Sequence, residues 1–250
     1  MLSTQEKLRY SRQIMLNKVG EQGQLKLRNA TVLIVGMGGL GNPVALYLAA
    51  AGVGKLLIAD GDEVDITNLQ RQVLFSQQDV KLNKADTASE KLQLNNPDVD
   101  IEVIDEMLDE ELADYYIPNV DLVIDCTDNI AARYLLNKAC LQHKKPLILG
   151  AATGFDGQQM VIDPNNQESA CYQCVFPSAE NAPVNNCQTI GILGPILAVI
   201  GGVQATEALK ILMGLPVKTN RLALYDGLNQ QWQYFNVKKQ TSCTACGHSK

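Results

Sequence analysis

The chain has 250 residues, of which 46% are hydrophobic and only 19% are charged. This length is enough for one sizeable core, and the charged share is low against a typical ~25%, which predicts that part of the surface is buried against a second copy of the chain. The net charge is −6 and the sequence has no basic arm or block of lysines, which argues against nucleic acid and anionic membranes as partners.

The first residues lack the basic and apolar regions of a secretory signal, so we expect a cytoplasmic protein. Two stretches, 29–54 and 181–206, carry no charged residue. Glycines interrupt both, and the apolar block of the second, about 190–203, is shorter than the ~20 residues that a membrane span requires. We therefore expect no membrane segment, and a buried or interface helix in the second stretch.

Apolar strand-like runs alternate with helical patterns through the first 150 residues. Such alternation, with each strand a solid apolar run, predicts a parallel sheet that is covered on both faces. The expected helices are 2–27, 43–51, 80–95, 109–116 and 131–142, and the expected strands are 31–35, 55–59, 101–104, 122–124 and 147–149.

Beyond Gly154 the pattern changes to strands joined by hairpin-type turns, at 158–162, 221–225 and 230–237, with the apolar helix continuing over 201–213. These strands are expected to extend the same sheet in antiparallel fashion. The sequence thus predicts an α/β fold with a Rossmann-like doubly wound sheet, formed by residues 1–250 as a single domain.

A nucleotide site is predicted where the first strand meets the second helix. Gly36, Gly38 and Gly41 match G-x-G-x-x-G in the strand–turn–helix context that the motif requires, so backbone N–H groups and the helix N-terminus could approach a phosphate. Asp60 ends the next strand, nineteen residues after Gly41, where a carboxylate could hold ribose hydroxyls. These features alone also suit an NAD-dependent oxidoreductase.

Three further charged residues exceed what a dinucleotide site needs. Arg71 and Lys84 could bring positive charge to phosphates, and Asp128, after the third buried strand, is an oxygen ligand suited to Mg²⁺. Each has an alternative role. Lys84 could belong to a solvated helix face with its neighbouring lysines 81 and 91, Arg71 could pair with an aspartate at 62 or 65, and Asp128 could cap the helix that begins near residue 130.

Seven cysteines in a cytoplasmic chain are not expected to form structural disulfides. Two Cys-x-x-Cys pairs, 171/174 and 243/246, suit four thiolates around a structural Zn²⁺, with a redox dithiol as the competing interpretation. Cys126 and Cys140 are expected to be inert core thiols. Cys187 lies in a polar, uncharged stretch and is a candidate reactive thiol. The proposed zinc ligands are Cys171, Cys174, Cys243 and Cys246.

Several motifs together resemble the ThiF/MoeB family of ATP-dependent adenylyltransferases. They are Arg9-Tyr-Ser-Arg-Gln13, Gly36-Met-Gly-Gly-Leu-Gly41, Asn68-Leu-Gln-Arg-Gln72, Asp125-Cys-Thr-Asp-Asn129 and the paired Cys-x-x-Cys. The resemblance implies that MgATP is surrounded by Gly39, Asp60, Asn68, Arg71, Gln72, Lys84, Asp128 and Asn129. It also implies a homodimer in which Arg12 reaches the phosphates of the other subunit, and it supports zinc at the four cysteines.

The activity implied by this resemblance is acyl-adenylate formation. The C-terminal glycine carboxylate of a ubiquitin-like sulfur carrier attacks the α-phosphate of ATP and pyrophosphate leaves. No general base is needed, because a carboxylate is already ionised at pH 7. Residues 186–189 and 225–232 resemble ThiF more than MoeB, which implies a ThiS-like carrier and thiamine thiazole synthesis. In ThiF-like proteins the cysteine matching Cys187 bonds covalently to the activated carrier terminus.

Other partners and activities stay open at this point. The same chemistry on a MoaD-like carrier for molybdenum cofactor synthesis is the nearest alternative. A tRNA-modifying relative is disfavoured by the acidic composition. The resemblance also suggests a sulfur-donor protein as a further partner. An NAD-dependent oxidoreductase would leave Arg71, Lys84, Asp128 and the four cysteines without a role.

Overall fold

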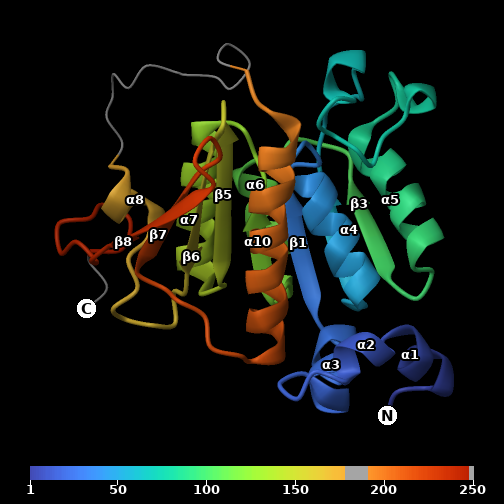
Figure 1. Cartoon of the computed structure of the whole chain (residues 1–250). Coiled ribbons are helices and arrows are strands. Elements are labelled where there is room, and N and C mark those ends of the chain that lie inside the picture. The colour runs from blue at the N-terminus through green and yellow to red at the C-terminus, as the bar shows by residue number, and fades with distance from the viewer. Residues whose placement is uncertain (178–190, 248–250) are drawn as a thin grey trace.

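A computed structural model describes residues 1–177 and 191–247 (Figure 1). One eight-stranded sheet, in the order β3-β2-β1-β4-β5-β6-β7-β8, forms the centre of the molecule. The first five strands are parallel and the last three are added antiparallel, as expected. The strands are β1 (Thr31–Val35), β2 (Lys55–Ala59), β3 (Asp100–Ile104), β4 (Leu122–Asp125), β5 (Leu147–Thr153), β6 (Asp156–Ile162), β7 (Arg221–Asp226) and β8 (Gln231–Asn236).

The register brings the carboxyl ends of the first parallel strands to one edge of the sheet. Val35 of β1 lies between Ala59 of β2 and Asp125 of β4. The chain leaves β1 toward β2 on one side, whereas β4 lies on the other, so the order of strands reverses at β1. In doubly wound sheets, ligands bind in the crevice outside the strand ends at this point.

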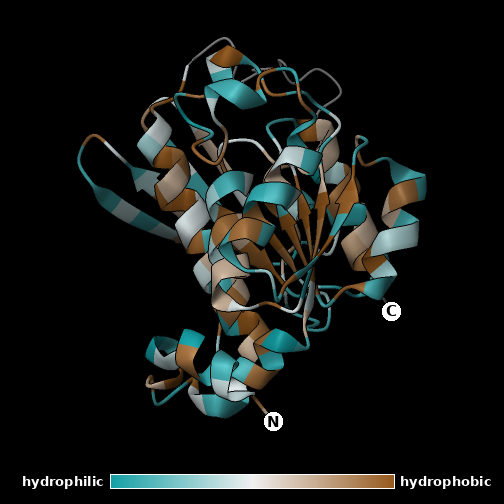
Figure 2. Cartoon of the chain, turned by 90° about the vertical axis from the view of Figure 1, so that its right-hand side faces the viewer, coloured by the Kyte–Doolittle hydropathy of each residue, from teal (hydrophilic) through white to brown (hydrophobic). Residues whose placement is uncertain are grey.

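Helices cover both faces of the sheet, and Figure 2 shows the apolar strands enclosed between them. The packing follows from the solid Val, Ile and Leu runs of the parallel strands, which need apolar partners on both sides. One face carries α4 (Gly41–Ala51), α5 (Lys84–Asn95) and α10 (Gly194–Met213); the other carries α6 (Glu110–Tyr116) and α7 (Ile130–His143), with the short α8 (Tyr172–Val175).

The prediction of one helix over 2–27 is wrong. The segment forms α1 (Thr4–Arg9), α2 (Ser11–Ile14) and α3 (Gly20–Arg28). Ser3 begins α1 with a capping box to Glu6. The backbone departs from helical geometry at Gly20, the first residue of α3, which has a φ of 56°. Because the apolar residues here are mixed with polar ones, no continuous apolar face required a single helix.

The start of one further helix differs from the prediction. The helix expected over 80–95 begins at Lys84, because Lys81 has a φ of 74° and the Asn83 side chain caps the Asp86 N–H at 3.0 Å. Short 3₁₀ turns, η1 (Ile66–Asn68), η2 (Gln77–Asp79) and η3 (Ile117–Asn119), occupy parts of the loops.

Helix α10 is long and apolar enough to meet a composition test for a membrane span. It nevertheless packs along the sheet against β4, β5 and β6 and against α4 (Figure 1). Its buried residues include Leu197, Ile200 and Ala205, whereas Val199 and Thr206 are exposed. The expectation of a buried or interface helix is therefore confirmed for the side of α10 that packs on the sheet. The other side of the helix is exposed to solvent.

Candidate active site

The glycine loop between β1 and α4 has no room for side chains at two positions. Gly36 has a φ of 94°, and a Cβ there would lie 2.8 Å from the Cys126 carbonyl oxygen. A Cβ on Gly41 would lie 1.9 Å from the carbonyl oxygen of Gly36. The first contact ties the loop to the turn after β4, and the second closes the loop onto the start of α4. Both glycines are thus required by the close turn that the motif predicts.

The other two glycines of the loop, Gly38 and Gly39, lie against different elements. A Cβ on Gly39 would come within 2.4 Å of Leu197 in α10, whereas Gly38 leaves ordinary contact distance, 3.6 Å, to the Gln72 amide. Gln72 is buried, and its Oε1 makes no hydrogen bond within the described residues. Gln72 therefore borders the glycine loop, and its Oε1 is available as an acceptor to a ligand.

Asp60 has a structural contact that the sequence did not reveal. Its carboxylate accepts hydrogen bonds from the backbone N–H of Met37, at 2.7 Å, and of Asp62, at 2.9 Å. Burial raises the pKa of this carboxyl, against the lowering influence of the Lys84 ammonium. Asp60 thus holds the glycine loop in addition to any role toward a ribose.

Asn42 is a site residue that the sequence analysis missed. Its Nδ2 donates to the Met37 carbonyl at 2.7 Å, and its Oδ1 accepts from the backbone N–H of Leu74 at 3.0 Å. Asn42 is therefore a buried link between the glycine loop and the segment after Arg71. A single polar residue in an otherwise apolar helix was the only available signal.

Lys84 lies at the first position of α5 and is not part of a solvated helix face. Only 8% of its side chain is exposed, and its ammonium contacts the Asp62 carboxylate at 2.7 Å. Lys81 is exposed, and Lys91 pairs with Asp79 at 2.6 Å. The fold therefore distinguishes Lys84 from its neighbours by placing it at the carboxyl edge of the sheet beside Asp60.

Arg71 does not pair with either nearby aspartate. Its Nη1 donates to the Thr67 carbonyl at 2.9 Å, while Asp65 caps η1 by accepting from the Thr67 N–H. Asn68 completes the capping box, because its Oδ1 accepts a hydrogen bond from the Asp65 N–H at 3.1 Å. The guanidinium of Arg71 makes no ion pair with any described residue, so its charge is available to an anion.

In the turn after β4, Asp128 has no side-chain partner among the described residues. The predicted capping role belongs to Asn129, whose Oδ1 accepts from the Ala132 N–H at 2.7 Å. Asp128 is exposed, and the structure describes no hydrogen bond or ion pair to its carboxylate. A free carboxylate at the strand ends is the kind of ligand that Mg²⁺ takes together with substrate phosphates.

Arg12 does not join the other predicted residues within one chain. It is exposed on α2, and its neighbour Gln13 donates to the carbonyl of Ala51 at 3.1 Å. Ala51 ends α4, whereas the glycine loop lies at the start of that helix, about 15 Å away along its axis. Figure 1 shows α2 below the sheet, at the end opposite the strand tips.

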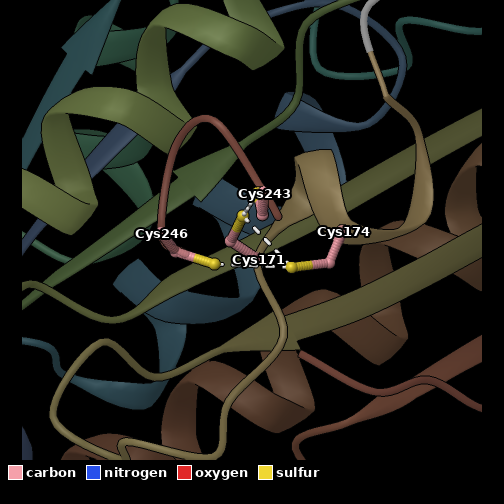
Figure 3. A group of neighbouring side chains, drawn as sticks. All are labelled: Cys171, Cys174, Cys243 and Cys246. Atoms are coloured by element: carbon pink, nitrogen blue, oxygen red, sulfur yellow. Dashed lines mark hydrogen bonds between the residues drawn. The ribbon is translucent and has the colours of Figure 1, made fainter. Parts of the chain in front are cut away.

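The four predicted zinc ligands converge on one point (Figure 3). The Sγ–Sγ distances are 3.8 Å for Cys171–Cys174, 3.6 Å for Cys171–Cys243 and 3.4 Å for Cys174–Cys246. Four thiolates at ~2.3 Å from a tetrahedral zinc lie about 3.8 Å apart, so the cluster fits that ion and is too open for disulfides. Burial raises the pKa of the Cys171 thiol, and a bound cation would favour its thiolate form.

The remaining cysteines divide into two groups. Cys126 and Cys140 are buried in the core, as expected, and burial raises the pKa of both thiols, which disfavours the reactive thiolate form. Cys187 lies outside the described residues.

Comparison with known proteins identifies relatives over nearly the entire chain. The ThiF family model matches residues 10–245. The chain is 43% identical over 242 residues to "Sulfur carrier protein ThiS adenylyltransferase" of Escherichia coli K12, covering 97% of this chain and 96% of that protein. It is 44% identical over 248 residues to "Adenylyltransferase and sulfurtransferase MOCS3" of Culex quinquefasciatus, covering 98% of this chain but only 56% of the relative.

Solved structures share the fold. The crystal structure of E. coli MccB with MccA-N7isoASN superposes with a TM-score of 0.83 at 26% identity, over 96% of this chain and 75% of that one. The structure of E. coli MccB with ATP gives 0.82 at 25% identity, over the same shares of the two chains. The doubly wound sheet is therefore an architecture in which a relative has been crystallised with ATP.

Proposed function

This chain belongs to the ThiF family, and we propose that residues 1–250 form a single adenylation domain that activates a ubiquitin-like sulfur carrier with ATP. The observation that carries the proposal is the set of groups at the sheet edge. The glycine loop, the unpaired Arg71, the buried Lys84 and the free Asp128 carboxylate all follow strands or turns at the carboxyl ends.

The proposed reaction joins the carrier's C-terminal glycine carboxylate to the α-phosphorus of ATP. A carboxylate oxygen forms the new P–O bond, the bond to the β-phosphate bridging oxygen breaks, and pyrophosphate leaves. No proton has to be removed from the nucleophile. The task of the protein is to bring two anions together and to stabilise charge on the phosphoryl oxygens.

Each group of the site has a part in that task. Backbone N–H groups of the glycine loop, with Gln72, Asn68 and Asn129 around it, bind and orient the nucleotide. Arg71 and Lys84 stabilise the phosphate charge, for which Lys84 exchanges or shares its Asp62 contact. Asp128 holds Mg²⁺, which when bound neutralises part of the triphosphate charge.

A ThiS-like carrier is the preferred substrate. The E. coli relative that this chain covers over 96% of its length is a ThiS adenylyltransferase by name. Residues 225–232 also resemble ThiF more than MoeB. We therefore propose that the sulfur on the carrier is used in thiamine thiazole synthesis. A MoaD-like carrier is not favoured, and an NAD-dependent oxidoreductase would leave the basic residues and Asp128 unused.

The proposal includes the remaining predicted features. Zinc is held by the four cysteine thiolates and ties the C-terminal segment to the segment around α8. The Cys187 thiol loses its proton and forms a thioester with the carrier's terminal carbonyl as the bond to AMP breaks and AMP leaves. A sulfur-donor protein is a further partner. We place the protein in the cytoplasm, without nucleic acid or membrane partners. A homodimer would cover the open side of α10 and bring Arg12 to the phosphates of the other subunit.

ATP–pyrophosphate exchange tests the proposed function. The protein is incubated with MgATP and labelled pyrophosphate, alone and with a ThiS-like or a MoaD-like carrier. We expect label in ATP only with carrier, and faster with the ThiS-like one. Carrier truncated by its terminal glycine is the matched control and should give no exchange. NADH turnover without exchange, or carrier binding with neither activity, would contradict an adenylyltransferase.

Mixed dimers test the proposed role of Arg12. Arg12→Ala and Arg71→Ala chains are each expected to be nearly inactive, but a heterodimer of the two has one site with both arginines. Random 1:1 pairing makes half of the dimers mixed, so about a quarter of wild-type exchange should return when the two variants are coexpressed. If Arg12 acts on its own chain's site, coexpression will restore nothing.

A further inference from the structure

The turn that carries Asp128 is held by a network of buried polar groups. Asp125, the last residue of β4, accepts two hydrogen bonds at Oδ1 from Thr127, one from its N–H at 2.9 Å and one from its Oγ1 at 2.7 Å. Arg133 in α7 donates from Nη2 to the Thr127 carbonyl at 3.0 Å. Three polar groups of Thr127, the residue immediately before Asp128, are thus fixed.

A second helix holds the same turn from the other face of the sheet. Gln204 in α10 is fully buried, and its Nε2 donates to the Asp125 backbone carbonyl at 2.8 Å. Gly150 of β5 leaves the space for this side chain, because a Cβ there would lie 2.3 Å from the Gln204 amide. Helices α7 and α10 lie on opposite faces, so the turn is clamped from both sides.

A contribution to stability does not explain this network of buried polar groups. Asp125 is completely buried, its Oδ2 has no hydrogen bond among the described residues, and the nearest cation, Arg133 Nε, is 3.8 Å away. A buried charge with an unsatisfied oxygen costs free energy, and apolar residues of similar volume often serve a core better. The cost is understandable if the position of the turn matters for function.

We propose that Asp125, Arg133 and Gln204 are positioning residues that hold the turn so that Asp128 presents its carboxylate to the metal of MgATP. The inference rests on the proposed function, because it assumes that Asp128 meets Mg²⁺ there. Groups that orient a metal ligand typically change metal affinity or activity by about 10–100-fold when they are removed.

Two variants weaken the clamp with little change in volume or charge. Gln204→Leu removes the donor to the Asp125 carbonyl, and Arg133→Lys keeps the positive charge but removes the fork that reaches Thr127. The chain offers matched controls at the opposite end of the molecule. Gln24 is fully buried and donates to the Ala51 carbonyl at 2.9 Å, and Arg28 donates to the Met1 carbonyl while pairing with Glu6.

The measurement is ATP affinity by calorimetry, with Mg²⁺ and with EDTA, on the full chain. The quantity compared is the ratio of the ATP affinity with Mg²⁺ to the ATP affinity in EDTA. We expect this ratio to be about tenfold lower in Gln204→Leu and Arg133→Lys than in the wild-type protein, with the affinity in EDTA unchanged. Saturating Mg²⁺ should restore their carrier-dependent exchange. Gln24→Leu and Arg28→Lys should keep the wild-type ratio of the two affinities, even where their melting temperatures fall.

Two results would overturn the inference: a wild-type ratio in both clamp variants, or an equal loss of affinity with and without Mg²⁺, which is the mark of a structural role. If Gln204→Leu does not fold, Arg133→Lys decides alone. Failure of the proposed function is distinct, because the wild-type protein would then show no carrier-dependent exchange in the same preparation.

Discussion

Alanine at Arg71 or at Lys84 is expected to lower the rate of carrier-dependent adenylation by about 10²–10³-fold, the usual effect of losing one donor to transition-state charge. Both cations lie at the strand ends. The Arg71 guanidinium forms no ion pair with a described residue, and the Lys84 ammonium is held in a buried position beside Asp60. Negative charge on the phosphoryl oxygens is stabilised most by charges that are already in place when it develops.

The loss should not come from unfolding. Lys84→Ala leaves Asp62 without its partner, but the Asp62 side chain is 54% exposed and can be hydrated. Among the described residues, the Arg71 side chain makes its hydrogen bond to the exposed backbone carbonyl of Thr67. We therefore expect melting temperatures near that of the wild-type protein for both variants.

Pyrophosphate exchange at saturating carrier checks this expectation, and Lys91→Ala is the matched control. Lys91 lies on the same helix as Lys84 and pairs with Asp79, away from the glycine loop. Its variant should keep wild-type exchange. Unchanged exchange in both Arg71→Ala and Lys84→Ala would remove these residues from the site.

Removal of zinc is expected to produce the second large effect, on stability. The four thiols join residues 171–174 to residues 243–246, which are far apart in the chain. Since zinc binding and folding are coupled, loss of the ion should free the C-terminal segment and cost several kcal/mol. For a chain of this size each kcal/mol lowers the melting temperature by about 2–4 °C, so a fall on the order of 10 °C is expected.

Metal analysis and thermal unfolding measure this effect. The wild-type protein should contain one zinc per chain, and Cys243→Ser should lose the metal, melt earlier and become sensitive to proteases near its C-terminus. Cys140→Ala serves as control, because it removes a buried thiol outside the cluster and should retain the zinc. A metal-free wild-type protein with an unchanged melting temperature would argue against a structural zinc.

Most of the sheet could be predicted from local pattern. The apolar runs at 31–35 and 55–59 match β1 and β2 residue for residue, and the change beyond Gly154 matches the switch to antiparallel strands. Solid apolar runs are informative because a strand that is buried on both faces admits few other residues. The glycine loop was equally clear, since close turns exclude side chains at Gly36 and Gly41.

The contacts of the site residues were less predictable. The sequence left Lys84 as one of three neighbouring lysines, and only the packing of α5 shows that it is buried while Lys81 is exposed. Asp60 was expected near a ribose, yet both of its oxygens already accept backbone N–H groups. Gln204 gave no signal at all, because it meets Asp125 across 78 residues of intervening chain.

By itself, the sequence determined the strands, the glycine turn and the two Cys-x-x-Cys pairs. Each of these depends on residues that are close together in the chain or on side chains with a strong preference for one environment. Tertiary structure alone decided which charged side chains form ion pairs among the described residues and which do not. It also decided that Arg12 lies at the opposite end of the folded molecule from the glycine loop of the same chain. Those outcomes depend on contacts between distant segments, whose distances and burial are set only when helices pack on the sheet.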